Sequence, residues 1–339
     1  MKTLQLGIIG CGFWANFQVA GWLELPEVQI VAVCDRDQAK AQALAAKFGI
    51  NKVYHDAAEM LNKEALDCVD IITNVETHRT FVEMVAARGI SVICQKPMGQ
   101  TLDEAYNMVK FCHERKVKFF VHENFRWQHQ LRRVKAALDS GVIGKVFKAR
   151  ITFCSAFDVY KNQPFLADTE HFVLTDIGSH FLDEARYLFG EAKSLYCQTH
   201  SVNPRIKGED AAEVFLKMQN GVSCYVEMSY ASILEYDMFP ETHLLIEGEA
   251  GSIHLDRHYT LKITTRNGTT QEDVQAPVYT WADPTYAVFH ASIVDCNRDI
   301  LQDLQGIKTA ETTGTDNLKT VALVWASYDS AAKNEVIYF

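Results

Sequence analysis

The sequence contains no apolar run of the roughly 18–20 residues that a membrane-spanning helix needs. It also lacks an excess of positive charge: 33 lysines and arginines stand against 43 aspartates and glutamates, a formal charge of −10. We therefore expect no membrane span and no general attraction to nucleic acid or anionic lipid. The N-terminal stretch MKTLQLGIIGCGF has a short apolar segment broken by glycines and no small-residue cleavage site, so we predict a first strand there and not a signal peptide.

Paired cysteines are also missing. The nine cysteines are odd in number and scattered along the chain, and no two of them form a CxxC pair. Several lie within apolar runs, where a free thiol behaves as a small hydrophobic side chain. This usage predicts a reduced, cytoplasmic protein with no disulfide framework, no zinc ribbon and no other metal site.

The residues that are present indicate two domains. The chain has 339 residues, 48% of them hydrophobic, and a single core usually stops growing at roughly 250–300 residues. Near the N-terminus, short β-branched runs alternate with helix-like stretches, which predicts βαβ units and a parallel sheet with helices on both faces. The predicted strands are 4–10, 28–35, 68–73, 90–94 and 118–122, and the predicted helices are 14–25, 37–48, 78–88 and 102–115.

The second part of the chain follows a different pattern. After a helix-like segment at 129–139, longer runs are separated by glycines and short turns, which predicts a large, mostly antiparallel open sheet. Further helices are predicted at 172–189, 285–304 and 314–333. We expect an α/β protein with one domain over 1–123 and a second, for substrate binding and oligomerisation, over 124–339.

The first predicted strand leads directly into a glycine-rich turn, GIIGCGFWA. Gly10, Gly12 and Ala15 fit the G-x-G-x-x-G/A pattern, with Phe13 and Trp14 on the same turn. In this pattern the first glycine permits a tight turn, the second lets the backbone approach a pyrophosphate, and the third small residue keeps the helix close to the sheet. A bare tight turn is the alternative, but the flanking strand and helix favour a Rossmann dinucleotide-binding domain.

Asp35 ends the second predicted strand, 25 residues after Gly10. This spacing is close to that of the acidic residue that binds the adenosine ribose in Rossmann domains. The alternative for Asp35 is an N-cap of the next helix. A carboxylate accepts hydrogen bonds from free ribose hydroxyls and repels a 2′-phosphate, so the sequence favours NAD over NADP, although the neighbouring Arg36 offers a phosphate partner.

Polar residues follow the later strands of the predicted parallel sheet. Because ligands bind beyond the carboxyl ends of such strands, these residues are expected at one edge. Lys96 is prominent among them, since Pro97 restricts the backbone before it and limits where the lysine side chain can point. A surface lysine before a turn is the alternative. The residues at these strand ends are Thr73, Asn74, Gln95, Lys96, Pro97, Glu123 and Asn124.

A second group of polar residues lies in TDIGSHFLDEARYL, residues 175–188. In a helix, Asp176 and His180 share one face, four residues apart. Such spacing is typical of a solvated face or of two metal ligands, but no third ligand is evident. Gly178 weakens a helix without a structural gain that the sequence reveals, which favours a site.

The sequence resembles the Gfo/Idh/MocA family, named after glucose-fructose oxidoreductase and inositol dehydrogenase. The motifs GIIGCGFWA, TNVETH, CQKP and DIGSH carry the resemblance, in matching order over essentially the whole chain. Members of the family are mostly NAD(P)-dependent oxidoreductases of sugars, cyclitols and related diols. The resemblance implies Lys96, Asp176 and His180 as catalytic residues and Asn74, His78, Gln95 and Asn124 as cofactor neighbours.

Two features refine the resemblance. The family usually has Glu-Lys-Pro where this chain has Gln95, so one negative charge beside the lysine is absent. CQKP together with VHENFRWQ is similar to the branch that oxidises the branched pentose D-apiose. The resemblance also leaves two other functions open: an NAD-binding sensor without chemistry, and NAD-assisted elimination of glycosides.

For hydroxyl oxidation we expect the nicotinamide to accept the hydride and the protein to supply proton transfer. His180 is the expected base, with Asp176 orienting it or the substrate and Lys96 stabilising the developing alkoxide. Lys96 as the base is the alternative. Arg126 is a further candidate for contacting the sugar or polyol substrate, together with these three residues. Apolar content on both faces of the second sheet predicts a homodimer or homotetramer.

Overall fold

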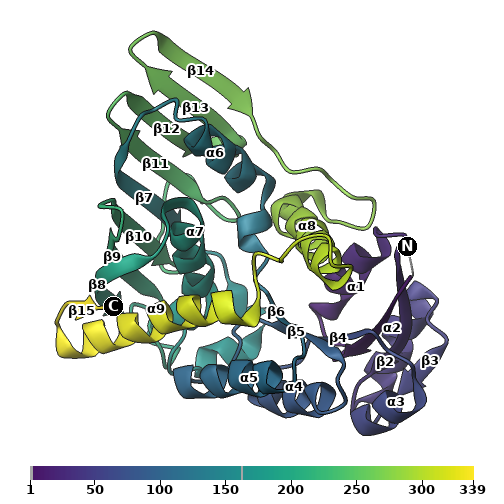
Figure 1. Cartoon of the computed structure of the whole chain (residues 1–339). Coiled ribbons are helices and arrows are strands. Elements are labelled where there is room, and N and C mark those ends of the chain that lie inside the picture. The colour runs from purple at the N-terminus through teal and green to yellow at the C-terminus, as the bar shows by residue number, and fades with distance from the viewer. Residues whose placement is uncertain (1–2, 162) are drawn as a thin grey trace. The chain divides into compact units, whose positions relative to one another are not determined.

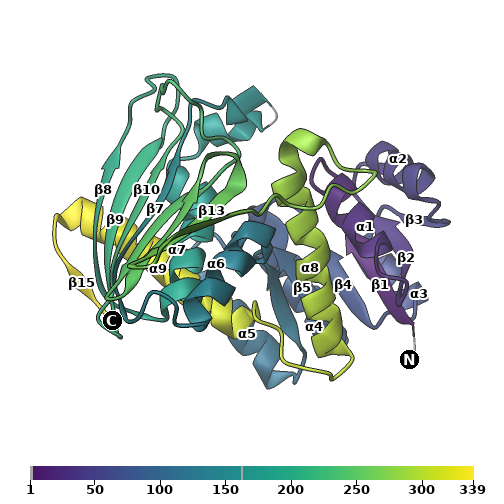
Figure 2. The same cartoon turned by 90° about the horizontal axis from the view of Figure 1, so that it is seen from above.

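The computed structural model describes residues 3–161 and 163–339, and it divides into two compact units (Figure 1; Figure 2). The first comprises Met1–Trp127 and Val278–Val321, and the second comprises Gln128–Pro277 and Ala322–Phe339. This division differs from the predicted boundary after residue 123, because a late segment of the chain returns to the first unit. Its helix α8 (Ala287–Leu304) packs against α1 (Ala15–Leu23) in that unit.

The first unit is built on a sheet whose six described strands are all parallel, in the order β3-β2-β1-β4-β5-β6. The order reverses between β1 and β4, which is where open α/β sheets bind ligands. Five of the strands were predicted, and the three-residue β3 was missed. The strands are β1 (Leu4–Ile9), β2 (Val28–Cys34), β3 (Lys52–Tyr54), β4 (Cys68–Ile71), β5 (Ser91–Gln95) and β6 (Phe119–His122).

Local capping explains where the helices of this sheet begin. Asp37 caps α2 by accepting from the backbone N–H groups of Ala39 and Lys40. Thr101 caps α5 through a 3.1 Å hydrogen bond from the Glu104 N–H. The connecting helices are α1 (Ala15–Leu23), α2 (Gln38–Phe48), α3 (Ala57–Lys63), α4 (His78–Ala86) and α5 (Leu102–Glu114).

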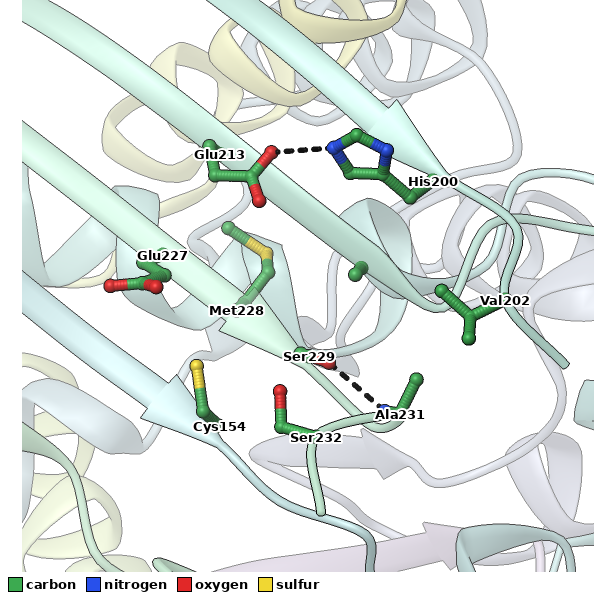
Figure 3. A pocket seen from close by; sticks show the side chains of 10 residues that line it. Cys154, His200, Val202, Glu213, Glu227, Met228, Ser229, Ala231 and Ser232 are labelled. Atoms are coloured by element: carbon green, nitrogen blue, oxygen red, sulfur yellow. Dashed lines mark hydrogen bonds and ion pairs between the residues drawn. The ribbon is translucent and has the colours of Figure 1, made fainter. Parts of the chain in front are cut away.

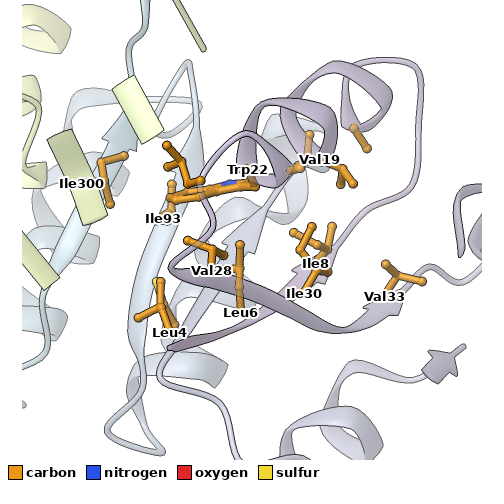
Figure 4. Packing of buried hydrophobic residues seen from close by; sticks show 14 of the residues in the cluster. Leu4, Leu6, Ile8, Val19, Trp22, Val28, Ile30, Val33, Ile93 and Ile300 are labelled. Carbon is orange, nitrogen blue, oxygen red and sulfur yellow. The ribbon is translucent and has the colours of Figure 1, made fainter. Parts of the chain in front are cut away.

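One apolar core holds the glycine-rich turn and the strand ends in place. Trp22 of α1 is completely buried beside Leu6 and Ile93, and α8 contributes Ile300 to the same cluster (Figure 4). Burying a side chain of this size stabilises a protein by roughly 1.5–3 kcal/mol. The core therefore fixes the edge from which the predicted cofactor residues project.

The second unit contains a sheet of nine described strands in the order β14-β13-β12-β11-β7-β10-β9-β8-β15. β10 pairs with β7 in parallel, and the other pairs that we describe are antiparallel, which confirms the predicted mostly antiparallel sheet. The strands are β7 (Val146–Cys154), β8 (Ala192–His200), β9 (Ala211–Met218), β10 (Ser223–Ser229), β11 (His243–Gly248), β12 (Gly251–Asp256), β13 (Thr260–Thr265), β14 (Gly268–Asp273) and β15 (Ile337–Tyr338).

Helices cover one face of this second sheet. Helix α6 (His129–Asp139) packs on β12, and α7 (Ser179–Phe189) packs on β10 (Figure 1). Val226 and Met228 of β10 are buried on the covered face, whereas Tyr225 on the other face is 45% exposed. Helix α9 (Gly314–Lys333) begins in the first unit and ends in the second, and β15 follows it.

Within residues 3–161 and 163–339, no helix has the length and apolar character needed to cross a membrane.

Candidate active site

The glycine-rich turn has the geometry that the motif predicts. Gly10 has a φ of +99°, and a Cβ on it would lie 2.4 Å from the carbonyl oxygen of Ile72, so only glycine fits. A Cβ on Gly12 would meet no atom within 4 Å, so the space beside its backbone is open. Ala15 is completely buried at the start of α1, and Phe13 is 57% exposed on the same turn. These features fit a pyrophosphate at the helix N-terminus.

Asp35 lies beside this turn at the end of β2. One carboxylate oxygen accepts from the Cys11 N–H and the other from the Asp37 N–H, both at 2.8 Å. Because Asp37 is the N-cap of α2, the alternative role of Asp35 as that cap is wrong. Each carboxylate oxygen has two acceptor sites, so Asp35 retains capacity for ribose hydroxyls. Arg36 next to it is exposed.

His78 holds the ends of β4 and β5 together. Its Nε2 lies 3.0 Å from the Thr73 carbonyl oxygen, and its Nδ1 lies 3.0 Å from the Pro97 carbonyl oxygen. The side chain is 1% exposed, and burial lowers its pKa, while the neighbouring carbonyl oxygens of Thr73 and Pro97 raise it. The predicted cofactor neighbour His78 therefore shapes the loops that carry the exposed Asn74 and the partly exposed Lys96.

The side chain of Gln95, another predicted cofactor neighbour, turns inward. It is 7% exposed and its Nε2 donates to Gln18 Oε1 at 2.5 Å. Its Oε1 accepts from the backbone N–H of Lys96 at 2.9 Å. The Gln95 side chain thus holds the backbone of Lys96 through this hydrogen bond.

Two residues after β6 form hydrogen bonds with the late segment of the first unit, Val278–Val321. The Asn124 amide, 2% exposed, donates to Ser292 Oγ at 2.6 Å. Arg126 is 5% exposed, and its guanidinium donates to the Asp316 carboxylate and the Glu311 carbonyl oxygen, both at 3.0 Å. These partners hold the Arg126 guanidinium and the Asn124 amide in place. The contact of Arg126 with substrate and that of Asn124 with the cofactor stay predictions.

Glu123, the residue that directly follows β6, is completely buried. Burial raises the pKa of its carboxyl group to about 7, although the charges of Lys96 and Arg126 lower it. The positive charge of Lys96 therefore has an acidic neighbour even though residue 95 is a glutamine.

Asp176 and His180 lie in the second unit, on a segment that differs from the predicted continuous helix. Residues Leu174–Gly178 form a π-helical turn, and α7 begins only at Ser179. Such turns are frequent at functional sites. Tyr230 donates its hydroxyl hydrogen to the Asp176 carboxylate at 3.3 Å, and His180 is 4% exposed in the first turn of α7.

Gly178 has a packing reason that the sequence did not reveal. A Cβ at this position would lie 2.9 Å from the sulfur of Met228 on β10. The glycine therefore allows the π-helical turn to approach the sheet closely, and its presence alone is no argument for a site.

The structure thus gathers the predicted cofactor residues at one edge of the first sheet and places Asp176 with His180 in the second unit. Sequence reasoning missed Gln18, Asp70 and Tyr230. A signal existed for Asp70, which is a charged residue in an otherwise apolar strand, CVDI.

A hollow of about 250 Å³ lies on the second sheet (Figure 3). It is lined by residues of β7, β8, β9 and β10, including Cys154, His200, Glu213 and Glu227, and His200 Nε2 lies 3.1 Å from Glu213. None of the predicted catalytic residues lines it. Among the residues that the structure describes, no group of three or more His, Cys, Asp and Glu could hold a metal ion.

Comparison with known proteins tests the predicted family. Residues 4–123 match the oxidoreductase family with an NAD-binding Rossmann fold, and residues 131–254 match the GFO/IDH/MocA C-terminal domain. The chain belongs to the Gfo/Idh/MocA family. This confirms the predicted family, an oxidoreductase with an NAD-binding Rossmann domain followed by the family's C-terminal domain.

Two curated proteins are similar to this chain over 90% or more of their own length. D-apiose dehydrogenase of Rhizobium rhizogenes is 41% identical over 99% of this chain and 98% of its own. D-apiose dehydrogenase of Paraburkholderia graminis is also 41% identical, over 99% and 90%.

Solved structures with the same fold are also similar to this chain. An oxidoreductase from Agrobacterium radiobacter, solved with NAD+, L-tartaric acid and magnesium, is 41% identical with a TM-score of 0.97 over 99% of this chain and 98% of that one. Levoglucosan dehydrogenase with NADH and levoglucosan has a TM-score of 0.86 over 99% of each chain at 19% identity, which shows the fold alone.

Proposed function

We propose that this Gfo/Idh/MocA member is an NAD-dependent dehydrogenase that oxidises a hydroxyl of a sugar or polyol, with D-apiose or another aldose oxidised at C1. The full-length 41% identity to two D-apiose dehydrogenases carries this proposal. The open backbone at Gly12 and the acceptor capacity of Asp35 fit a bound dinucleotide. When bound, NAD supplies the hydride acceptor.

The chain's own residues have distinct roles in this proposal. The Lys96 ammonium donates a hydrogen bond to the reacting oxygen and stabilises its developing negative charge. His180 accepts the hydroxyl proton, and Asp176 orients the imidazole or the substrate. The hydrogen bond from Tyr230 supports the orientation of the Asp176 carboxylate. Lys96 as the proton acceptor is the competing assignment.

Two other functions make different predictions in one assay. A sensor binds NAD and produces no NADH with any substrate, and an NAD-assisted eliminase consumes a glycoside without net NADH. The NADH absorbance is therefore followed over a panel of D-apiose, other free aldoses, cyclitols and glycosides. We expect net NADH with free aldoses, and most rapidly with D-apiose.

Asp35 is expected to make the enzyme prefer NAD over NADP, measured as the ratio of kcat/KM for the two cofactors. Asp35→Asn should lower this ratio by about tenfold or more, since hydrogen bonds to charged groups contribute roughly 1.5–3 kcal/mol. Arg36→Ala is the matched control and should raise the ratio, because it removes the neighbouring cation. A wild-type preference for NADP would mean that Arg36 dominates this site.

We also propose that the chain forms a homodimer or homotetramer through the face of the second sheet that α6 and α7 leave open. Phe215 and Tyr225 on this face have ring centroids 4.8 Å apart, and Leu245 is 38% exposed. Sedimentation at micromolar concentration should give a multiple of 38.3 kDa, and Tyr225→Glu should lower it. A lone-chain mass for the wild type would contradict this.

The nine buried free cysteines support a reducing, cytoplasmic location.

A further inference from the structure

A buried chain of hydrogen bonds connects an unassigned carboxyl group to the backbone of Lys96. Asp70 of β4 is completely buried, and its Oδ2 accepts from Gln18 Nε2 at 2.7 Å and from Trp22 Nε1 at 2.8 Å. Gln18 Oε1 in turn accepts from Gln95 Nε2 at 2.5 Å, and Gln95 Oε1 accepts from the Lys96 N–H at 2.9 Å. Both glutamines are buried, so this chain does not exchange its partners with water.

The chemistry of the two ends fixes the direction of every bond in the chain. A backbone N–H and an indole N–H can only donate. Gln95 must therefore direct its oxygen to Lys96 and its NH₂ group to Gln18, whose own NH₂ group must face Asp70. Reversing either amide would place two acceptors or two donors against each other. The network consequently has one hydrogen-bonded arrangement.

The direction of the chain is the same in both protonation states of Asp70. Burial raises the pKa of Asp70 to about 7, while the hydrogen bonds from Trp22 and Gln18 lower it. Because Oδ2 already accepts from two N–H groups, a proton on this carboxyl group must reside on Oδ1. Oδ2 therefore accepts from Gln18 throughout.

A buried carboxyl group stabilises this core less than an apolar side chain of similar size would. Burying a charge costs far more than packing an apolar side chain, and well-packed hydrophobic groups often replace buried polar networks without loss of stability. The surroundings are apolar: Cys68 and Ile71 of the same strand and Cys94 of the next are completely buried. The chain ends at the one residue of this edge to which we assign chemistry.

We propose that Asp70 is a positioning residue for Lys96, acting through the amides of Gln18 and Gln95; this rests on the proposed role of Lys96. Asp70 fixes Gln18, Gln18 fixes Gln95, and Gln95 holds the Lys96 backbone so that the ammonium is presented in one direction. The arrangement also accounts for glutamine at position 95. A glutamate there would offer an acceptor to Gln18 Oε1, where the chain requires a donor.

The test compares two variants that each remove one hydrogen bond to the same Asp70 oxygen. Gln18→Met breaks the path to Lys96, and we expect kcat to fall by about tenfold or more, as is usual when a group that orients a functional residue is lost. The KM for NAD should stay within about threefold. Trp22→Phe is the matched control: it leaves the amide path intact, so it should lower the Tm but leave kcat within about threefold.

A double-mutant cycle with Lys96→Met separates positioning from general damage. Gln18→Met should cause no further loss of kcat in the Lys96→Met background, since the positioned group is already absent. Additive losses, or equal losses of kcat in Gln18→Met and Trp22→Phe, would overturn the proposal. If Gln18→Met does not fold, Gln95→Glu enters the same cycle with the same expectation, and full activity of Gln95→Glu overturns it. Full turnover of Lys96→Met alone would instead reject the proposed role of Lys96.

Discussion

Replacing Lys96 with methionine is expected to lower turnover by about 10²–10³-fold while the affinity for NAD stays within a few-fold. Methionine keeps the length and packing of the side chain but removes the ammonium. Loss of one donor that stabilises a developing oxyanion typically raises the barrier by about 2.7–4 kcal/mol. NAD affinity is retained because the turn at Gly10 and Gly12, together with Asp35, carries the phosphate and ribose contacts in this proposal.

The measurement is kcat from NADH absorbance at saturating aldose, together with the NAD dissociation constant from calorimetric titration. Lys110→Met is the control, because Lys110 is an exposed lysine of α5 whose recorded partner, Glu114, is 4.0 Å away. A Lys96→Met enzyme with normal turnover would show that Lys96 is only a turn residue. A large loss of NAD affinity would assign the lysine to cofactor binding instead.

The features that could be predicted from the sequence are those that neighbouring residues determine. Gly10 and Gly12 follow a strand and precede a helix within one short segment, and the structure shows the tight turn that this pattern requires. Asp35 was placed correctly at its strand end, but finding that Asp37 caps the next helix required the actual hydrogen bonds.

The features that were missed depend on residues far apart in the chain. The return of residues 278–321 to the first unit depends on the packing of α8 against α1, which no local pattern encodes. The strand-end position of Arg126 was foreseeable, but the direction of its side chain is set by Asp316, 190 residues later. The packing reason for Gly178 could not be predicted, because the side chain that lies against it, Met228, comes fifty residues later in the chain.

Replacing His180 with asparagine is the second substitution from which we expect a large loss of turnover. A catalytic base has to accept a proton, and the amide side chain of asparagine cannot do so. His180→Asn keeps a polar side chain that can form hydrogen bonds, but it cannot accept the hydroxyl proton near neutral pH. Losing a group that transfers a proton typically costs about 10²–10⁴-fold in rate, so we expect kcat to fall by ~100-fold or more. His200→Asn is the control, since His200 is an exposed histidine of the same unit with a single Glu213 contact recorded.

The pH profile decides between the two candidate bases. A neutral imidazole is lost as the pH falls, so a wild-type profile that depends on His180 declines on its acidic side. In His180→Asn this acidic limb should disappear along with most of the activity, whereas His200→Asn should keep both. Near-normal turnover of His180→Asn would remove the histidine from proton transfer. The base would then have to be Lys96. In that case Lys96 would both accept the hydroxyl proton and stabilise the reacting oxygen, and Lys96→Met would lose its activity completely.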